Sequence, residues 1–258
     1  MQKIFEDQVA IVTGAGQGIG FQICRQLALS GARVLLNDIE ASLADEAAHR
    51  IREEKCLCHA VPGDASDIDF IQTLTQEAVV RYGKLNIAIA NAGITLFGDF
   101  LSYDPDDFNR VMKVNLAGSF FFAQAAARVM KEQEPRGGRI LFMSSVTGHQ
   151  AHKDLSAYGM SKAALEMLAK TLVAELSTYG ITVNAVAPGA TLNERTANDP
   201  KYNETWSRIT PLGKPASTED VAQAALFLVS PQAGHITGQS LIIDGGWSSV
   251  SPSPYEEV

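Results

Sequence analysis

The sequence has few cysteines, few basic residues relative to acidic ones, and no long apolar run. Three cysteines among 258 residues, Cys24, Cys56 and Cys58, cannot all pair, which excludes a small disulfide-stapled scaffold and favours a reducing compartment. No apolar stretch approaches the roughly 18 residues that a membrane-spanning helix needs. Acidic residues precede the first apolar run, where a signal peptide would be basic and then apolar, so we expect no membrane partner and a cytoplasmic location.

The shortage of basic residues bears on the partners of the protein. Lys and Arg number 21 against 29 Asp and Glu, for a formal net charge of −8. This balance repels nucleic acid and anionic lipid, so we expect no nucleic-acid partner. Cys56, Cys58 and His59 superficially have the spacing of metal ligands, but no second ligand pair accompanies them. The alternation there predicts a short strand, and we expect no metal.

What the sequence does contain is an alternation of apolar, β-branched runs with helical segments. Near-continuous apolar strands separated by helices are typical of parallel sheets that are covered on both faces. The pattern predicts an α/β fold, namely a single-domain Rossmann-type doubly wound sheet of seven parallel strands over residues 1–258, with a polar tail from about residue 248. The expected strands are residues 8–13, 33–37, 57–61, 85–90, 139–144, 182–187 and 240–244.

Helix signals lie between these strands. Asp104 followed by Pro105 is typical of an N-cap with proline in the first turn, and Ser217 or Thr218 predicts another helix start. The helix expected after the fifth strand carries an apolar stripe at steps of three and four, formed by Leu165, Leu168, Leu172 and Leu176. Extending this stripe backwards places Tyr158 and Lys162 on the face turned towards the sheet.

A glycine-rich segment, TGAGQGIG, follows the first expected strand at residues 13–20 and opens a helix. Gly14, Gly18 and Gly20 permit a tight turn and a close approach of the backbone to a pyrophosphate at the helix N-terminus. Asp38 ends the second strand about twenty residues later, where an acid accepts hydrogen bonds from a ribose and repels a 2′-phosphate. Gln17 places no basic group in the loop. These features predict that the cofactor is NAD rather than NADP.

A tyrosine and a lysine stand four residues apart, 13 residues after a serine: Tyr158, Lys162 and Ser145. A phenol with the ordinary pKa near 10 is a poor base at neutral pH, and a cation within hydrogen-bonding distance favours the phenolate. The alternative is a packed tyrosine beside an exposed lysine. The upstream serine and the glycine loop favour a general acid/base on a helix.

In this order the motifs resemble those of the classical short-chain dehydrogenase/reductase family, over about residues 7–247. Besides the segments above, the marks are NAG at 91–93, VNLAG at 114–118, SS at 144–145, PG at 188–189 and ITGQSLIIDGG at 236–246. The overall pattern is most similar to the glucose dehydrogenase-like and 3-oxoacyl-thioester reductase-like branches. The resemblance implies a homotetramer.

The resemblance also implies roles for individual residues. Tyr158 corresponds to the general acid/base, Lys162 to the residue that assists it and holds the nicotinamide ribose, Ser145 to the residue that binds the substrate oxygen, and Asn115 to the support of a proton-relay water. Asn115 could instead bridge backbone groups at a helix kink. The residues implied to bind the cofactor are Gly14, Gln17, Gly18, Ile19, Gly20, Asp38, Asp64, Ala65, Asn91, Ala92, Gly93, Tyr158, Lys162, Pro188, Gly189 and Thr191.

One departure from the family pattern concerns the nicotinamide carboxamide. Thr191 and Asn193 stand where the family often has an aliphatic residue and a threonine, so either is a candidate for the carboxamide contact. We expect the walls of the substrate pocket to be residues 94–97, 146–155 and 191–211, the last a mobile lid. His149 and His152 would lie near its mouth, as substrate contacts or as solvated loop residues.

The expected function is NAD-dependent hydride transfer between nicotinamide and a small-molecule secondary alcohol or ketone. The alternatives are an NADPH-linked 3-oxoacyl-thioester reductase and a catalytically silent nucleotide-binding sensor or scaffold. Phe120, Phe121 and Phe122 are consecutive and cannot all point inwards from one helix, which predicts a subunit interface.

Overall fold

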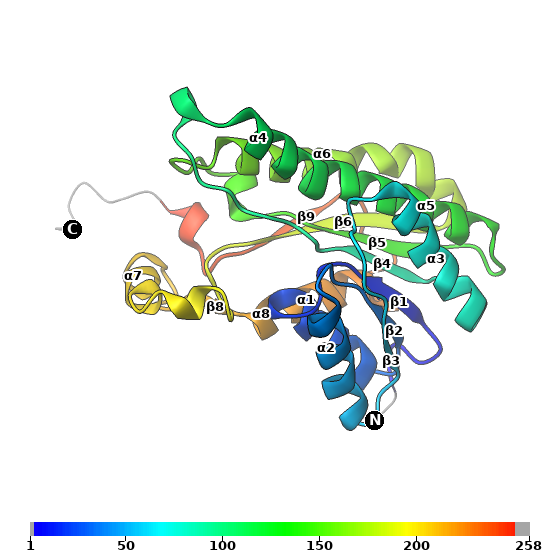
Figure 1. Ribbon diagram of the computed structural model, residues 1–258. Coiled ribbons are helices and arrows are strands. Elements are labelled where there is room, and N and C mark those ends of the chain that lie inside the picture. The colour runs from blue at the N-terminus through cyan, green and yellow to red at the C-terminus, as the bar shows by residue number, and fades with distance from the viewer. Residues whose placement is uncertain (1–2, 251–258) are drawn as a thin grey trace.

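Seven short apolar strands form one parallel sheet in the computed structural model, which describes residues 3–250 (Figure 1). The strand order is β3-β2-β1-β4-β5-β6-β9. All seven predicted strands are confirmed, as is the single-domain Rossmann-type doubly wound fold. The bounds are β1 Val9–Val12, β2 Arg33–Leu36, β3 Cys58–Ala60, β4 Ile87–Ala90, β5 Gly138–Met143, β6 Ile181–Pro188 and β9 Ser240–Ile243.

Helices cover both faces of this sheet in two separate layers (Figure 1). On one face lie α1 Gly18–Leu29, α2 Ala41–Glu53 and α8 Thr218–Val229; on the other lie α3 Ile68–Tyr82, α4 Pro105–Val111, α5 Ser119–Glu132 and α6 Ser156–Leu176. Successive strand residues point to opposite faces, so Val34 and Leu36 enter one core and Leu35 the other. The buried strand residues are almost all apolar, with Thr182 and Asn184 of β6 as polar exceptions, which explains the near-continuous hydrophobic runs.

The helix boundaries follow from their capping residues. Asp104 accepts hydrogen bonds from the N–H groups of Asp106 and Asp107 at the start of α4, with Pro105 in the first turn. Ser217 and Asp220 form a reciprocal capping box at the start of α8, which confirms this start and identifies Ser217 as the cap. Gly83 ends α3 in the left-handed conformation, with φ 76°.

Short elements connect and extend the layers. A second sheet pairs the two-residue strands β7 Thr191–Leu192 and β8 Ala216–Ser217, and α7 Tyr202–Ile209 lies beyond one end of the main sheet beside β8 (Figure 1). Two-residue strands have too little periodicity to be predicted. A π-helical segment, η2 Met112–Gly118, joins α4 to α5. The 3₁₀ turns are η1 Phe100–Ser102, η3 Val146–Gly148, η4 Ser177–Tyr179, η5 Thr196–Asn198, η6 Pro231–Ala233 and η7 Trp247–Ser249.

The end of the chain differs in part from the expected polar tail. Trp247 and the two serines after it form η7, and residues 251–258 lie outside the described range. Among residues 3–250, none of the helices combines the length and the apolar character needed to cross a bilayer.

Candidate active site

The glycine loop after β1 is packed so tightly that side chains are excluded from it. A Cβ atom on Gly14, whose φ is 60°, would lie 2.7 Å from the Cα atom of Ala92. A Cβ atom on Gly20 would lie 2.5 Å from the Nδ2 atom of Asn91. The loop therefore turns directly against the end of β4 and presents the N-terminus of α1, which is the geometry that a pyrophosphate needs.

Asn91 has a role in this loop that sequence reasoning missed. Its Nδ2 atom donates to Thr13 O at 2.9 Å and to Gly14 O at 2.7 Å. The Thr13 hydroxyl in turn accepts from the N–H groups of Asn91 and Ala92, each at 3.1 Å. These four bonds hold the glycine loop, residues 13–20 and the predicted phosphate loop, on the end of β4 beside the predicted cofactor residue Gly93.

Asp38, the predicted ribose contact, is held beside the glycine loop. Its Oδ2 atom accepts from the N–H of Gly16 at 2.9 Å and its Oδ1 atom from the N–H of Glu40 at 3.1 Å, so the carboxylate is fixed beside the phosphate loop. Gln17 is exposed at the N-cap of α1, and Ile19 packs partly against the core.

The loop after β3 completes this end of the site. Asp64 accepts two bonds from Ser66, from its N–H at 2.8 Å and its hydroxyl at 2.7 Å. A Cβ atom on Gly118 would lie 2.6 Å from Ala65 O, so η2 packs against this loop. The buried Asn37, also missed by sequence reasoning, holds the loop by donating to Val61 O and Gly63 O.

Tyr158 and Lys162 occupy the first two turns of α6. Tyr158 is half-buried, and Lys162 is only 3% exposed with its Nζ atom 5.5 Å from the centroid of the Tyr158 ring. Nζ donates to Met143 O at the end of β5, at 2.8 Å. Burial lowers the pKa of Lys162, and the neighbouring Tyr158 acts in the opposite direction. The prediction that both residues begin the sheet-facing side of this helix is in line with these positions.

Ser145 lies just beyond β5 and is 9% exposed. Its Oγ atom accepts a 3.3 Å hydrogen bond from the N–H of Thr147 and caps η3. This bond uses an acceptor lone pair, so the hydroxyl proton remains available for a substrate oxygen. The strand end thus brings Ser145 close to the helix that carries Tyr158 and Lys162.

Asn115 lies in the π-helical segment and is completely buried. Its side chain bridges the backbone of Ile94, accepting from the N–H at 2.8 Å and donating to the carbonyl at 3.0 Å. It also donates to Ser161 Oγ at 3.1 Å, and Ser161 donates to Tyr158 O at 2.7 Å. The alternative of a backbone-bridging Asn at a helix irregularity therefore describes its side chain, and the support of a relay water stays a prediction.

At the nicotinamide end, the chain passes close to the last strand. A Cβ atom on Gly189 would lie 2.6 Å from Asp244 Cβ, which explains a glycine after Pro188. Thr191 is 5% exposed and donates from its N–H to the Tyr202 hydroxyl at 3.1 Å. The Oδ1 atom of Asn193 accepts from two N–H groups of its own turn, and the Thr191 hydroxyl donates to Gly189 O at 3.1 Å, so both remain candidates for the carboxamide contact.

The two candidate histidines have separate environments. His149 Nε2 lies 2.8 Å from Glu166 Oε1. His152 belongs to an aromatic cluster, with its ring centroid 5.2 Å from that of Trp247 and 6.4 Å from that of Trp206. Sequence reasoning missed this cluster, since its rings come from three distant segments.

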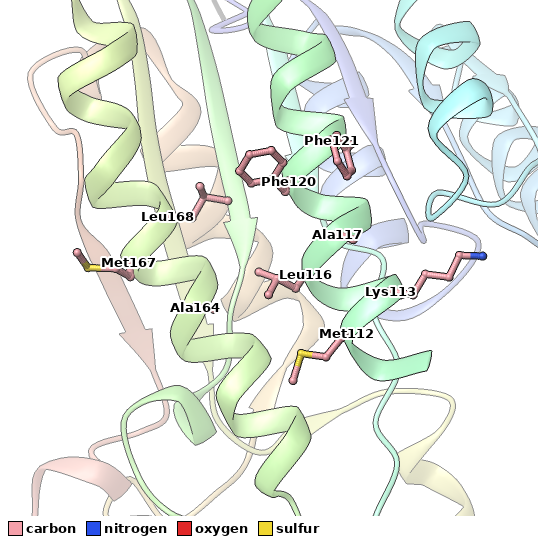
Figure 2. Close-up of a pocket in the computed structure, with 9 residues that line it drawn as sticks. All are labelled: Met112, Lys113, Leu116, Ala117, Phe120, Phe121, Ala164, Met167 and Leu168. Atoms are coloured by element: carbon pink, nitrogen blue, oxygen red, sulfur yellow. The ribbon is translucent and has the colours of Figure 1, made fainter. Parts of the chain in front are cut away.

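An apolar groove runs between α5 with η2 and α6 (Figure 2). Its volume is about 720 Å³, and Lys113 directs its ammonium away from the apolar side chains. Phe122 is buried in the core, whereas Phe120 is 41% exposed on this groove, so the prediction that the three phenylalanines cannot all point inwards is confirmed. The lining residues are Met112, Lys113, Leu116, Ala117, Phe120, Phe121, Ala164, Met167 and Leu168.

The residues at the strand ends fit a nicotinamide dinucleotide. A Cβ atom on Gly93 would lie 3.3 Å from both Asn115 Oδ1 and Lys162 Nζ, so the backbone there leaves a cradle that any side chain would fill. Asp38 and the glycine loop stand at one end of this edge, and Ser145, Tyr158 and Lys162 at the other. Among residues 3–250, no group of three or more His, Cys, Asp or Glu side chains is arranged to hold a metal ion.

Comparison with known proteins extends over nearly the whole chain. A family model described as enoyl-(acyl carrier protein) reductase matches residues 14–248. The chain is 36% identical to galactitol 2-dehydrogenase (L-tagatose-forming) of Cereibacter sphaeroides, covering 93% of this chain and 94% of that one.

Two solved structures are similar over the same extent. A short-chain type dehydrogenase/reductase from Mycobacterium marinum has a TM-score of 0.90 and 30% identity, covering 96% of this chain and 98% of that one. A gluconate 5-dehydrogenase from Burkholderia cenocepacia, solved with NADP and tartrate, has a TM-score of 0.90 and 31% identity, covering 97% and 98%. The chain therefore belongs to the classical short-chain dehydrogenase/reductase family and is an NAD(P)-dependent oxidoreductase that acts on CH–OH groups.

Proposed function

We propose that the protein is an NAD-linked dehydrogenase that oxidises a secondary alcohol to a ketone. The observation that carries this proposal is the convergence of Ser145, Tyr158 and Lys162 at the strand ends, beside the glycine loop. The nicotinamide, when bound, supplies the hydride acceptor. The chain supplies proton transfer and orientation.

In this mechanism Tyr158 removes the hydroxyl proton of the alcohol while hydride leaves the carbon. Ser145 donates its hydroxyl proton to the same oxygen and orients it. The buried Lys162 places its ammonium 5.5 Å from the centroid of the Tyr158 ring, where it would assist proton transfer and hold the nicotinamide ribose. In the reverse direction Tyr158 returns the proton to the ketone oxygen. Asn115 would support a water that carries the proton to solvent.

The preference for NAD rests on Asp38. Its carboxylate is fixed beside the phosphate loop by Gly16 and Glu40, where a 2′-phosphate would meet a negative charge. The exposed Gln17 offers no compensating cation. The NADP bound to the Burkholderia relative shows that this fold also accepts the phosphorylated coenzyme. The choice of NAD over NADP for this chain therefore depends on Asp38 and Gln17.

Calorimetric titration with NAD⁺, NADH, NADP⁺ and NADPH tests the coenzyme. We expect NAD(H) to bind more tightly than NADP(H). We expect Asp38→Ala to reduce the difference between the two affinities, because it weakens NAD(H) binding and removes the charge that repels the 2′-phosphate of NADP(H). A preference of the unmodified protein for NADP(H) would refute this use of Asp38 and would put the NADPH-linked 3-oxoacyl-thioester reductase first.

Tyr158→Phe tests the chemistry, because it removes the transferable proton with little change in shape. We expect near-complete loss of turnover with NAD affinity largely kept. Activity within a few-fold of the unmodified enzyme would refute the mechanism. Coenzyme binding without turnover across a broad alcohol and ketone panel would instead favour the sensor or scaffold.

For the substrate we propose a polyhydroxylated secondary alcohol, because the relatives named above act on galactitol and gluconate. Sugars, polyols and sugar acids are therefore the first compounds to screen, with 3-hydroxyacyl thioesters as the alternative class. We also propose a homotetramer in the cytoplasm. The apolar groove in Figure 2 supports self-association, and three free cysteines support a reducing compartment.

A further inference from the structure

A buried carboxylate outside the proposed catalytic group contacts the chain on both sides of Ser145. Glu166 lies on α6 one turn after Lys162 and is 8% exposed. Its Oε1 atom accepts a 2.6 Å hydrogen bond from Ser144 Oγ and lies 2.8 Å from His149 Nε2. Ser144 directly precedes Ser145, and His149 directly follows η3, which Ser145 caps. The Glu166 Oε1 atom therefore contacts residues on both sides of Ser145, namely Ser144 and His149.

The same strand end is tied to α6 at further points. Ser144 Oγ lies 3.0 Å from Lys162 O, and the Lys162 ammonium donates to Met143 O at 2.8 Å. A hydroxyl carries one proton, and the shorter, charge-assisted contact of Ser144 is the one to the Glu166 carboxylate. A Cβ atom on Gly148 would lie 3.1 Å from Glu166 Oε1, so the loop rests directly on this carboxylate.

We propose that Glu166 is a positioning residue for Ser145, an inference that rests on the proposed function. Burying a carboxylate is costly unless polar partners compensate it, and here those partners are the Ser144 hydroxyl and the His149 ring, one on each side of Ser145. Ser145 Oγ must stay within hydrogen-bonding reach of the oxygen that Tyr158 deprotonates. A displacement of about 1 Å in a positioned group can lower a rate about 100-fold. Glu166 thus fixes the strand end and the loop on the helix that carries the acid/base.

Glu166→Ala and Glu166→Gln test the proposal. We expect Glu166→Ala to lower kcat about 10- to 100-fold while the dissociation constants of NAD⁺ and NADH change less, because the Glu166 side chain contacts Ser144 and His149, neither of which is a predicted cofactor-binding residue. Both contacts use Oε1, and a glutamine keeps an oxygen there, so Glu166→Gln should retain most of the activity. Glu175→Ala is the matched control, since it removes an exposed carboxylate from the same helix.

A double-mutant cycle separates positioning from general stabilisation. If Glu166 acts through Ser145, then adding Glu166→Ala to the Ser145→Ala variant should lower kcat only slightly further. An equal loss in both backgrounds, or no loss in the single variant, would overturn the proposal. Full activity of Ser145→Ala alone would refute the proposed role of the serine itself, and with it this inference.

Ser144→Ala provides a second variant if Glu166→Ala does not fold. It removes the hydroxyl that bonds to Glu166 and leaves the carboxylate with His149. We expect it to lower kcat in the same direction and to be similarly non-additive with Ser145→Ala. A folded Ser144→Ala enzyme with unchanged kcat would contradict the proposal.

Discussion

Lys162, which we propose assists the acid/base Tyr158, is costly for folding. It is 3% exposed, and its burial lowers its pKa, opposed by the nearby Tyr158. A group with a lower pKa in the folded state binds fewer protons there than in the unfolded chain. Folding therefore pays a penalty at neutral pH that disappears as pH rises towards the ordinary lysine value of 10.5.

Lys162→Met should reveal this penalty. The variant lacks the titrating group, so its free energy of unfolding minus that of the unmodified protein should be larger at pH 7 than at pH 10. Other titrations cancel in the difference between the two proteins. Urea unfolding at both pH values measures it, and a difference that does not change with pH would contradict the prediction. Turnover should be lost at either pH.

The cysteines make a second prediction at this scale. Burial raises the pKa of Cys58 to about 12, and it raises that of Cys24 well above the ordinary value, with Cys58 contributing. Only thiolates react readily with iodoacetamide, and Cys56 is the partly exposed one. We expect mass spectrometry after treatment at pH 8 to find Cys56 modified first, with Cys24 and Cys58 reacting after denaturation. Early labelling of Cys58 in the folded protein would show that its burial is wrong.

Among whole elements, α8 depends on its capping box. Ser217 donates to and accepts from Asp220, and its hydroxyl lowers the pKa of that carboxyl. Because the folded pKa is lowered, the stabilisation is present above the unfolded pKa and is lost as pH falls through the folded pKa.

Ser217→Ala should therefore lower the free energy of unfolding by about 1 kcal/mol at pH 7. For a chain of this size the expected fall in Tm is about 2–4 °C. The loss should shrink near pH 3, and Ser217→Thr, which keeps a capping hydroxyl, should lose less. Thermal unfolding by circular dichroism measures both variants, and equal losses for alanine and threonine would argue against the cap.

The expected lid contains α7, which has no buried residue and is held by its aromatic side chains. Trp206 packs edge to face on Trp247, with ring centroids 5.2 Å apart, and Tyr202 lies 6.0 Å from Trp206. An aromatic pair of this kind contributes about 0.5–1.5 kcal/mol beyond its buried area. The mobility of this segment stays a prediction.

Trp206→Ala should free α7 from η7. We expect faster trypsin cleavage at Arg195, Lys201 or Arg208, and a higher KM with a smaller change in kcat, since the acid/base lies on another helix. Trp206→Phe retains an aromatic ring and serves as the control. Unchanged cleavage of the alanine variant would show that the cluster does not restrain the segment.

For the whole molecule, the groove between α5 and α6 predicts how copies associate. Among the groove-lining residues, Met167 on α6 is 63% exposed and Phe120 on α5 is 41% exposed (Figure 2). A contiguous apolar face on two helices is typical of an interface between subunits. The two-fold pairing of such a face would align the helices of two chains.

Phe120→Asp should weaken this association. We expect light scattering at micromolar concentration to give the mass of four chains for the unmodified protein and a smaller species for the variant, because a buried carboxylate without a partner is costly. An exposed acidic change elsewhere, Val80→Asp on α3, is the control. A monomer before any substitution would refute the tetramer.

Much of this architecture could be predicted from the sequence because its signals are local. The seven apolar runs, the caps at Asp104 and Ser217, and the glycine loop each depend on neighbours within a few residues. The motif order added the family and the set Ser145, Tyr158 and Lys162. The bounds of the strands differ from the expected ones by a few residues, since hydrogen-bond pairing and not hydrophobicity sets them.

By itself, then, the sequence determined the doubly wound sheet and the family, and it proposed the acid/base and the nucleotide loop. Only the tertiary structure decided what the polar side chains contact: Asn91 on the phosphate loop, Asn115 on Ile94, and Glu166 on both flanks of Ser145. The physical reason is the distance along the chain over which each interaction acts. Strand and helix patterns arise from nearest neighbours along the chain, whereas a buried polar group takes whichever donors and acceptors the folded chain brings within about 3 Å.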